Sequence, residues 1–499
     1  MVARLGLIGG LLAFFAVGLA PPPEGLAAAG QWAAATTVLM AVWWLTEALP
    51  PAATALVPIV VLPLVGAMAA GDVTRAYASE TNMMFLGGLM IATAVERWNL
   101  HRRMALTIVQ SFGRTPAGLV FGFMAATAAI SAWVSNAATT MMMMPIATAA
   151  LLNFREDSPD VERELGPPLL LSIAYAASIG GLATVIGTPP NAIFVGQMAR
   201  LFPDAPRVGF LQWMMVGVPT ALLLLPIAWL FLVRFASPLW SMKAVLDRSV
   251  IAGQRAKLGV MSKAERRVLI VFAMTAALWI FRSPIRTDGL SIPGWSELLS
   301  APDFVGDSTV SIGMTLLLFL IPSGQRSGEK LLDWQSAVGI PWGVFILLGG
   351  GFALADATRA TGLAQWIGQS LGAVGSLGPL ATVAILCLVV VFLTEVMTNT
   401  ALTTIMMPVL AASAVASGID PLLLMLPCTL AASLGFMLPS GTAPNAIVFS
   451  TGHVTVRYMA RVGFWLNILS VFVLTGITFA IARPVFGISL DSLPFWAHP

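Results

Sequence analysis

Ser135-Asn136-Ala137-Ala138-Thr139-Thr140 and Thr398-Asn399-Thr400-Ala401-Leu402-Thr403-Thr404 are two copies of one polar motif in a largely apolar chain. In each copy a proline, Pro145 or Pro408, follows the asparagine nine residues later. A single hydroxyl or asparagine inside an apolar helix usually bonds its own backbone or joins two helices. Two copies with equal internal spacing instead divide the chain into two related halves.

Each motif has a second piece further along the chain. Gly187-Thr188-Pro189-Pro190-Asn191 follows the first copy, and Gly441-Thr442-Ala443-Pro444-Asn445 follows the second. Glycine and proline interrupt helices, and a bilayer tolerates the freed backbone groups only where they are buried in protein or line a cavity. Matching interruptions in two halves of a membrane chain are typical of transporters whose site lies near the bilayer midplane. We therefore predict two broken helices that build such a site.

The composition indicates a membrane protein. Of the 499 residues, 58% are hydrophobic and only 10% are charged, whereas soluble domains have about 25% charged residues. The apolar stretches and the motif regions together predict an all-α polytopic membrane protein with about 11 transmembrane helices plus two re-entrant hairpins. We interpret the apolar run at 5–20 as the first membrane helix. The net charge of +3 gives no indication of nucleic-acid binding.

The halves predict two structural repeats, and Leu86-Gly87-Gly88 is echoed by Leu348-Gly349-Gly350. An odd number of crossings between the repeats would invert them relative to each other, and a parallel duplication is the alternative. The first repeat is predicted at 83–235, with its hairpin at 116–152 and its broken helix at 168–198, and the second at 311–483, with its hairpin at 376–415 and its broken helix at 422–450. N-terminal scaffold helices at 1–82 precede the first repeat, and a basic linker with a scaffold helix at 236–310 joins the two repeats. A C-terminal tail follows at 484–499.

Two polar segments complete the predicted topology. Eight basic residues from Arg234 to Arg267, against Asp247 and Glu265, predict a cytoplasmic loop. The alternative is a helix bound to the membrane surface, and one segment can be both. The charged stretch at 153–168, which has no counterpart in the second half, predicts a solvated loop.

The residues around the motifs suit a cation and an anion together. Ser131 precedes Ser135 by four residues and Thr394 precedes Thr398 by four, so each hydroxyl pair can share one helical face near the asparagine. Hydroxyl, amide and carbonyl oxygens form a neutral cage suited to sodium, and the N-terminus of a half-helix attracts an anion. No lysine or arginine lies beside the motifs, so co-bound sodium would neutralise an anionic substrate.

Other classes of function lack the residues that they need. The three histidines are scattered and Cys387 and Cys428 lie in apolar stretches, so the sequence predicts no enzyme, metal centre or cofactor. A channel or proton antiporter would need a pore or a relay of intramembrane carboxylates, for which Glu395 is the strong candidate. Glu395 has two interpretations, a direct ligand or a carboxylate that braces the hairpin through helix-end amides.

The motifs resemble those of the divalent anion:sodium symporter (DASS) family of dicarboxylate, citrate and sulfate transporters. The matching pieces are the two Ser/Thr-Asn motifs, the two Gly-Thr-X-Pro-Asn breaks, Trp43-Trp44-Leu45-Thr46-Glu47-Ala48-Leu49-Pro50 and Asp307-Ser308-Thr309-Val310. The resemblance covers residues 35–480. It implies a homodimer in the lipid bilayer in which each protomer has a static scaffold and a moving transport domain, the elevator arrangement.

The resemblance also implies roles for individual residues. The implied sodium sites comprise Ser131, Ser135, Asn136, Gly187, Thr394, Thr398, Asn399 and Gly441. The implied substrate site comprises Asn136, Ala137, Thr188, Thr398, Asn399, Thr400 and Thr442. Ala137 stands where the family has a threonine, and Ala443 stands where a proline is common.

The sequence therefore predicts a sodium-coupled symporter that imports a divalent organic anion, with a C4-dicarboxylate such as succinate as the leading substrate. The alternatives are a sulfate or tricarboxylate transporter, or a sodium-independent dicarboxylate exchanger of the same fold. Sodium ions are expected as co-transported ligands rather than cofactors. The expected location is a bacterial inner membrane, which the chain crosses many times.

Overall fold

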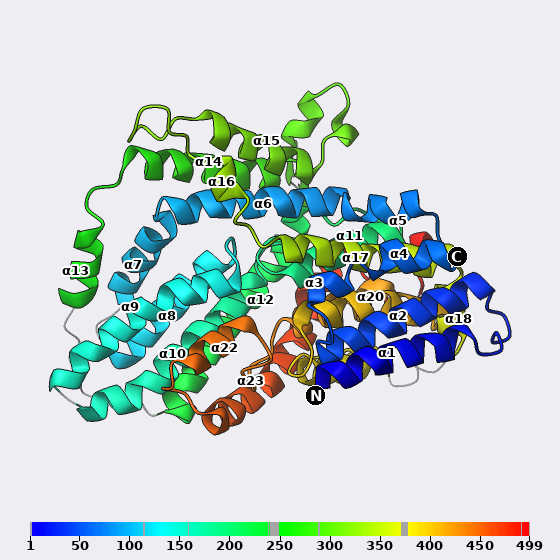
Figure 1. Cartoon of the computed structure of the whole chain (residues 1–499). Coiled ribbons are helices and arrows are strands. Elements are labelled where there is room, and N and C mark those ends of the chain that lie inside the picture. The colour runs from blue at the N-terminus through cyan, green and yellow to red at the C-terminus, as the bar shows by residue number, and fades with distance from the viewer. Residues whose placement is uncertain are drawn as a thin grey trace.

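The computed structural model describes residues 2–112, 115–157, 159–237, 239, 249–287, 290–370, 378–490 and 492–498. Helices dominate this part of the chain (Figure 1). The N-terminal helices are α1 (Val2–Gly18), α2 (Ala28–Thr46), α3 (Pro51–Thr54), α4 (Val57–Leu64) and α5 (Ala70–Tyr77). Helices α1 and α2 pack side by side at the lower right of Figure 1.

Helices α6 (Glu80–Arg97) and α7 (Leu100–Phe112) precede the first motif-bearing hairpin. A helical hairpin comes next, and then a helix that is interrupted at the first Gly-Thr-Pro motif. These elements are α8 (Pro116–Ser131), α9 (Asn136–Asp157), α10 (Pro159–Gly181), α11 (Pro189–Leu201), α12 (Phe210–Phe231) and the π-helical turn η1 (Leu232–Ala236).

The linker contains α13 (Ser249–Lys257), α14 (Lys263–Ile280), α15 (Asp307–Leu320) and α16 (Trp334–Ala337). Its short elements are η3 (Trp295–Leu298), η4 (Pro302–Phe304) and the antiparallel strands β1 (Ile285–Thr287) and β2 (Leu290–Ile292). Helices α14 and α15 run along α6 at the top of Figure 1. Positions 240–248 of the basic segment lie outside the described residues, and its cytoplasmic placement stays a prediction.

The second half repeats the order of the first. It comprises α17 (Trp342–Ala360), α18 (Leu363–Ser370), α19 (Pro379–Leu393), α20 (Asn399–Ala416), α21 (Pro421–Ala432), α22 (Ala443–Ser450) and α23 (Val456–Ile477), followed by η6 (Thr478–Ala482), α24 (Arg483–Phe486) and η7 (Phe495–Ala497). Hairpin α19/α20 corresponds to α8/α9, and the interrupted pair α21/α22 corresponds to α10/α11. The inversion of the repeats and the domain boundaries stay predictions.

The way the broken helices pack explains why the two motifs meet. The first segment of each broken helix packs on its own hairpin, α10 on α8 and α9, and α21 on α19 and α20. The second segment packs on the hairpin of the other half, α11 on α20 and α22 on α9. This exchange interlocks the two halves and brings the starts of α9, α11, α20 and α22 together.

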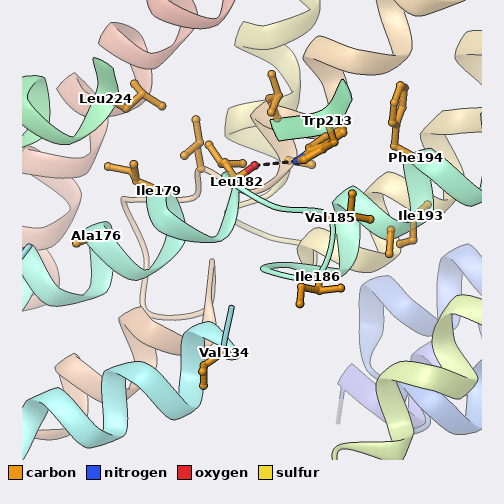
Figure 2. Packing of buried hydrophobic residues seen from close by; sticks show 14 of the residues in the cluster. Val134, Ala176, Ile179, Leu182, Val185, Ile186, Ile193, Phe194, Trp213 and Leu224 are labelled. Carbon is orange, nitrogen blue, oxygen red and sulfur yellow. Dashed lines mark hydrogen bonds between the residues drawn. The ribbon is translucent and has the colours of Figure 1, made fainter. Parts of the chain in front are cut away.

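Glycines allow the last helix of each half to approach the break closely. A Cβ on Gly217 of α12 would lie 2.3 Å from the Leu182 carbonyl oxygen, and one on Gly463 of α23 would lie 2.2 Å from that of Phe436. The Trp213 indole N–H also donates to the Leu182 carbonyl, at 2.9 Å (Figure 2). The carbonyl freed at the end of α10 is therefore satisfied within a packed apolar cluster.

One prediction of local structure was wrong. The stretch 153–168 is not a loop in its described part, because α9 continues to Asp157 and α10 begins at Pro159. Strands β1 and β2 form one short antiparallel pair in an otherwise largely helical fold, which agrees with the all-α prediction. They lie between Pro284 and Pro293 in a segment with β-branched residues, which favours extended backbone over helix.

Large apolar side chains on the outer helices face outward. Leu12 on α1 is 65% exposed, Leu222 on α12 is 66% exposed and Phe472 on α23 is 71% exposed. Among the described residues, four helices are long and apolar enough to cross a membrane, namely Phe210–Ala236, Trp342–Ala360, Asn399–Ala416 and Val456–Phe486. Six shorter apolar helices accompany them. The number of crossings stays a prediction.

Candidate functional site

Four helices begin at one cavity. Its volume is about 310 Å³ and its lining includes the first residues of α9, α11, α20 and α22, which are Asn136, Pro189, Asn399 and Ala443. Helix N-termini present the positive end of the helix dipole and unpaired amide hydrogens, except that Pro189 and Pro190 at the start of α11 have no N–H groups. The described residues that line the cavity include no charged side chain. The backbone rather than lysine or arginine therefore supplies the positive potential for an anion.

The structure brings the predicted site residues together. The cavity is lined by all seven residues of the predicted substrate site, Asn136, Ala137, Thr188, Thr398, Asn399, Thr400 and Thr442. It is also lined by Ser135, Gly187 and Gly441 of the predicted sodium sites. Ser131 and Thr394 do not line it and are fully buried behind the motif asparagines. The binding roles of these residues stay predictions.

Oxygen atoms cluster behind the cavity in the second half. The Thr394 hydroxyl lies 2.8 Å from Asn399 Oδ1 and 2.6 Å from the Ala432 carbonyl oxygen. The same Oδ1 lies 3.1 Å from the Ala432 carbonyl oxygen and 3.3 Å from that of Gly441. Two arrangements would satisfy these oxygens. A cation could bind among them, or the Asn399 amide could be reversed so that its nitrogen donates to them. Uncharged oxygens of this kind suit a hard cation such as sodium.

The first half has a matching cluster. The Ser131 hydroxyl lies 2.7 Å from Asn136 Oδ1 and 2.9 Å from the Ala177 carbonyl oxygen. The serines that follow the two carbonyl residues, Ser178 and Ser433, have buried hydroxyl oxygens without a hydrogen-bond partner. Sequence reasoning did not select these serines, because a single serine in an apolar helix is an ordinary feature.

The asparagine that ends each Gly-Thr-X-Pro-Asn motif holds the unwound segment. Asn191 Nδ2 donates to the carbonyls of Gly181 at 2.9 Å and Thr184 at 2.7 Å. Asn445 Nδ2 donates to those of Gly435 and Leu438, both at 3.0 Å. These bonds satisfy carbonyl groups that the end of a helix leaves free. The sequence marked both asparagines as part of a motif but did not predict this role.

Glu395 braces the unwound segment of the second half. Its carboxylate accepts hydrogen bonds from the backbone N–H groups of Met437 at 2.8 Å and Leu438 at 2.9 Å. Asn467 Nδ2 of α23 donates to it at 2.8 Å. In the first half, Ala132 replaces this carboxylate and its carbonyl accepts a hydrogen bond from the Thr184 hydroxyl. This geometry favours the bracing interpretation of Glu395.

Replacing Glu395 with glutamine is expected to raise the sodium concentration that gives half-maximal uptake about tenfold. A residue that orients the ligands of a metal site typically contributes 10–100-fold to metal affinity or activity. Glutamine keeps the shape but turns an amide NH₂ toward one of the three donors. The sodium concentration that gives half-maximal uptake measures the effect. Glu395→Ala should in addition lower thermal stability, since three donors lose their acceptor. An unchanged half-maximal sodium concentration in Glu395→Gln would argue against the bracing role of this carboxylate.

The fold and the site define a class of protein. Interrupted helices that begin at one cavity, whose described lining carries no charged side chain, are the architecture of a secondary transporter. The family model for the sodium:sulfate symporter transmembrane region matches residues 3–488. The chain therefore belongs to this family, as the DASS resemblance predicted. It is a multi-pass membrane protein.

Similar proteins agree with this assignment. Over 97% of its length the chain is 39% identical to the sodium-dependent dicarboxylate transporter SdcS of Staphylococcus saprophyticus, covering 92% of that protein. Identity to SdcS of Staphylococcus aureus is also 39%, with 98% and 92% covered. The fold is similar to the YdaH transporter of Alcanivorax borkumensis (TM-score 0.57, 13% identity, 93% of this chain and 100% of that one). It is equally similar to MtrF of Neisseria gonorrhoeae (TM-score 0.57, 13% identity, 97% and 96% covered).

Proposed function

We propose that the protein is a sodium-coupled symporter that imports C4-dicarboxylates such as succinate. The observation that carries this proposal is the meeting of four helix N-termini at one cavity, together with an oxygen cluster behind each motif asparagine. None of the described residues that line this cavity is charged. The helix ends suit carboxylates and the oxygen clusters suit sodium. The names of the SdcS relatives support both the substrate class and the ion.

Charge balance explains why sodium would be needed. A dianion that enters a low-dielectric cavity without a counter-charge is strongly disfavoured. Moving a dianion into a cell against 100 mV costs about 4.6 kcal/mol, from about 2.3 kcal/mol per charge. Two sodium ions cancel this cost, and a third makes entry electrically favourable. The two oxygen clusters supply a binding place for two of these ions.

Uptake of labelled succinate into proteoliposomes tests the coupling. An inward sodium gradient is expected to drive accumulation, and replacing sodium with choline should reduce the initial rate to that of empty liposomes. Three sodium ions per succinate would also make uptake faster when the interior is negative, which a potassium diffusion potential can impose. Uptake that is equal in sodium and choline would indicate the sodium-independent exchanger instead.

Sulfate is the second candidate substrate, because the matching family model is named for sodium:sulfate symport. Both anions are doubly charged, but succinate carries its two carboxylates at opposite ends of a four-carbon chain and can bridge the starts of α9 and α20. Competition by excess sulfate against labelled succinate distinguishes them. Sulfate is expected to compete weakly, and efficient competition would favour the sulfate assignment.

We further propose that the protein works as an elevator in a homodimer, as the resemblance implies. The interlocked hairpins and broken helices would move together, and α6, α14 and α15 would belong to the scaffold. Arg200 of α11 forms an ion pair with Asp356 of α17, and the Phe210 backbone N–H of α12 donates to Asp307 of α15 at 3.2 Å. An elevator movement would break these contacts. Light scattering of the solubilised protein tests the dimer.

A further inference from the structure

The two ends of the cavity differ in polarity. The halves pair Ala137 with Thr400, because each follows a motif asparagine, and Ile186 with Ser440, because each precedes a motif glycine. All four residues line the cavity. At both pairs the first half contributes only carbon atoms, whereas the second half contributes a hydroxyl group. At these two positions the first half therefore lines the cavity with less polar side chains than the second half does, beside its own Ser135, Asn136 and Thr188.

Trp133 adds a large aromatic ring to the part of the lining that the first half contributes. It lines the cavity, and its ring is held by Phe210 at 6.0 Å and by Phe272 at 5.0 Å between ring centroids. The paired position in the second half is Val396, which is 60% exposed and is not among the described residues lining the cavity. Of this pair of positions, only the one in the first half carries an aromatic ring that is among the described lining residues.

Both ends keep the groups that suit a carboxylate. Asn136 and Asn399 begin α9 and α20, and Thr188 and Thr442 precede α11 and α22. Amide hydrogens are therefore available from the starts of α9 and α20, one in each half, whereas Pro189 and Pro190 leave the first two positions of α11 without N–H groups. The difference between the ends concerns the space beside the carboxylate rather than the carboxylate itself. That space decides which substituent on the substrate is accepted.

We propose that the site selects C4-dicarboxylates with an apolar substituent beside one carboxylate, such as 2-methylsuccinate, over those with a hydroxyl substituent, such as malate. The inference rests on the dicarboxylate transport proposed above. Ala137 and Ile186 are the specificity-determining residues. A methyl group placed against these two side chains is removed from water, whereas a hydroxyl group there finds no hydrogen-bond partner on either side chain.

Competition against labelled succinate in the presence of sodium tests the proposal on the full-length protein. In the wild type, 2-methylsuccinate is expected to compete about fourfold better than succinate, the gain for burying one methyl group. Malate is expected to compete at least about fivefold worse than succinate, the loss for a buried unpaired hydroxyl. Malate that competes as well as 2-methylsuccinate would overturn the proposal.

Variants locate the preference in the structure. Ala137→Thr and Ile186→Ser introduce the hydroxyls of the second half, and each is expected to shift the malate to 2-methylsuccinate ratio about fivefold or more toward malate. Thr400→Ala is the matched control, because it removes the hydroxyl at the other end and should weaken both ligands without changing their ratio. Thermal stabilisation of the solubilised protein by each ligand gives the same ratio without transport.

The outcomes separate this inference from the proposed function. Sodium-dependent succinate uptake together with an unchanged ratio in both Ala137→Thr and Ile186→Ser would refute the selectivity alone. A wild-type protein that neither transports nor is stabilised by any of the three dicarboxylates would refute the proposed function and the selectivity with it.

Discussion

Replacing Asn399 with alanine is expected to lower sodium-dependent succinate uptake at least about 100-fold. Losing a residue that only orients the ligands of a metal site costs up to about 100-fold in affinity or activity, and a direct ligand should cost at least as much. Asn399 lines the cavity, and its side-chain amide lies 2.8 Å from the Thr394 hydroxyl and 3.3 Å from the Gly441 carbonyl oxygen. The substitution therefore removes a group proposed to contact both the sodium ion and the carboxylate. Initial rates of uptake into proteoliposomes measure the loss.

Asn136→Ala is the matched variant in the other half and should have an effect of similar size. The Ser131 hydroxyl would then lose its contact to Asn136 Oδ1, now 2.7 Å long. Both proteins should elute as the wild type does in size-exclusion chromatography, because each asparagine begins a helix whose backbone remains packed. Full transport by either variant would refute the proposed site.

Gly187→Ala is the second substitution with a large expected effect. A Cβ at this position would lie 2.5 Å from the Gly181 carbonyl oxygen and 3.0 Å from that of Ala132. Both obstacles are backbone, and the Gly181 carbonyl also accepts the Asn191 hydrogen bond. The unwound segment must shift, so uptake should fall at least about 100-fold, as expected when ligands move by about an ångström.

The control for Gly187→Ala is Gly71→Ala in α5. A Cβ on Gly71 would meet no atom within 4 Å, so uptake and thermal stability should stay near the wild-type values. A second readout separates lost binding from lost folding. Gly187→Ala should still give a folded protein, but sodium and succinate together should no longer raise its unfolding temperature. Retained stabilisation would show that this glycine does not shape the site.

Much of the site was predictable because its two motifs repeat. Membrane helices can be interrupted only where protein or a cavity satisfies the backbone, so Gly187 and Gly441 indicate a cavity from local chemistry alone. Their pairing with Asn136 and Asn399 indicated that the two interruptions belong to one site. The structure places all four residues on the same cavity.

Other features were less accessible to sequence reasoning. The charged stretch at 153–168 looked like a loop, yet its described part extends α9 and α10. Charged residues are common on exposed helical turns as well as in loops, so composition did not distinguish the two. The role of Glu395 was open for a different reason, because its partners Met437, Leu438 and Asn467 are distant in the chain.

The amino-acid sequence by itself determined the membrane environment, the two halves and the residues that interrupt their helices, since hydropathy and helix breaking depend on local chemistry. Only the tertiary structure decided which half-helix packs on which hairpin and how the two ends of the cavity differ. Those features depend on contacts between segments far apart in the chain. Local sequence carries the chemistry of each group, but packing sets the distances at which the groups act together.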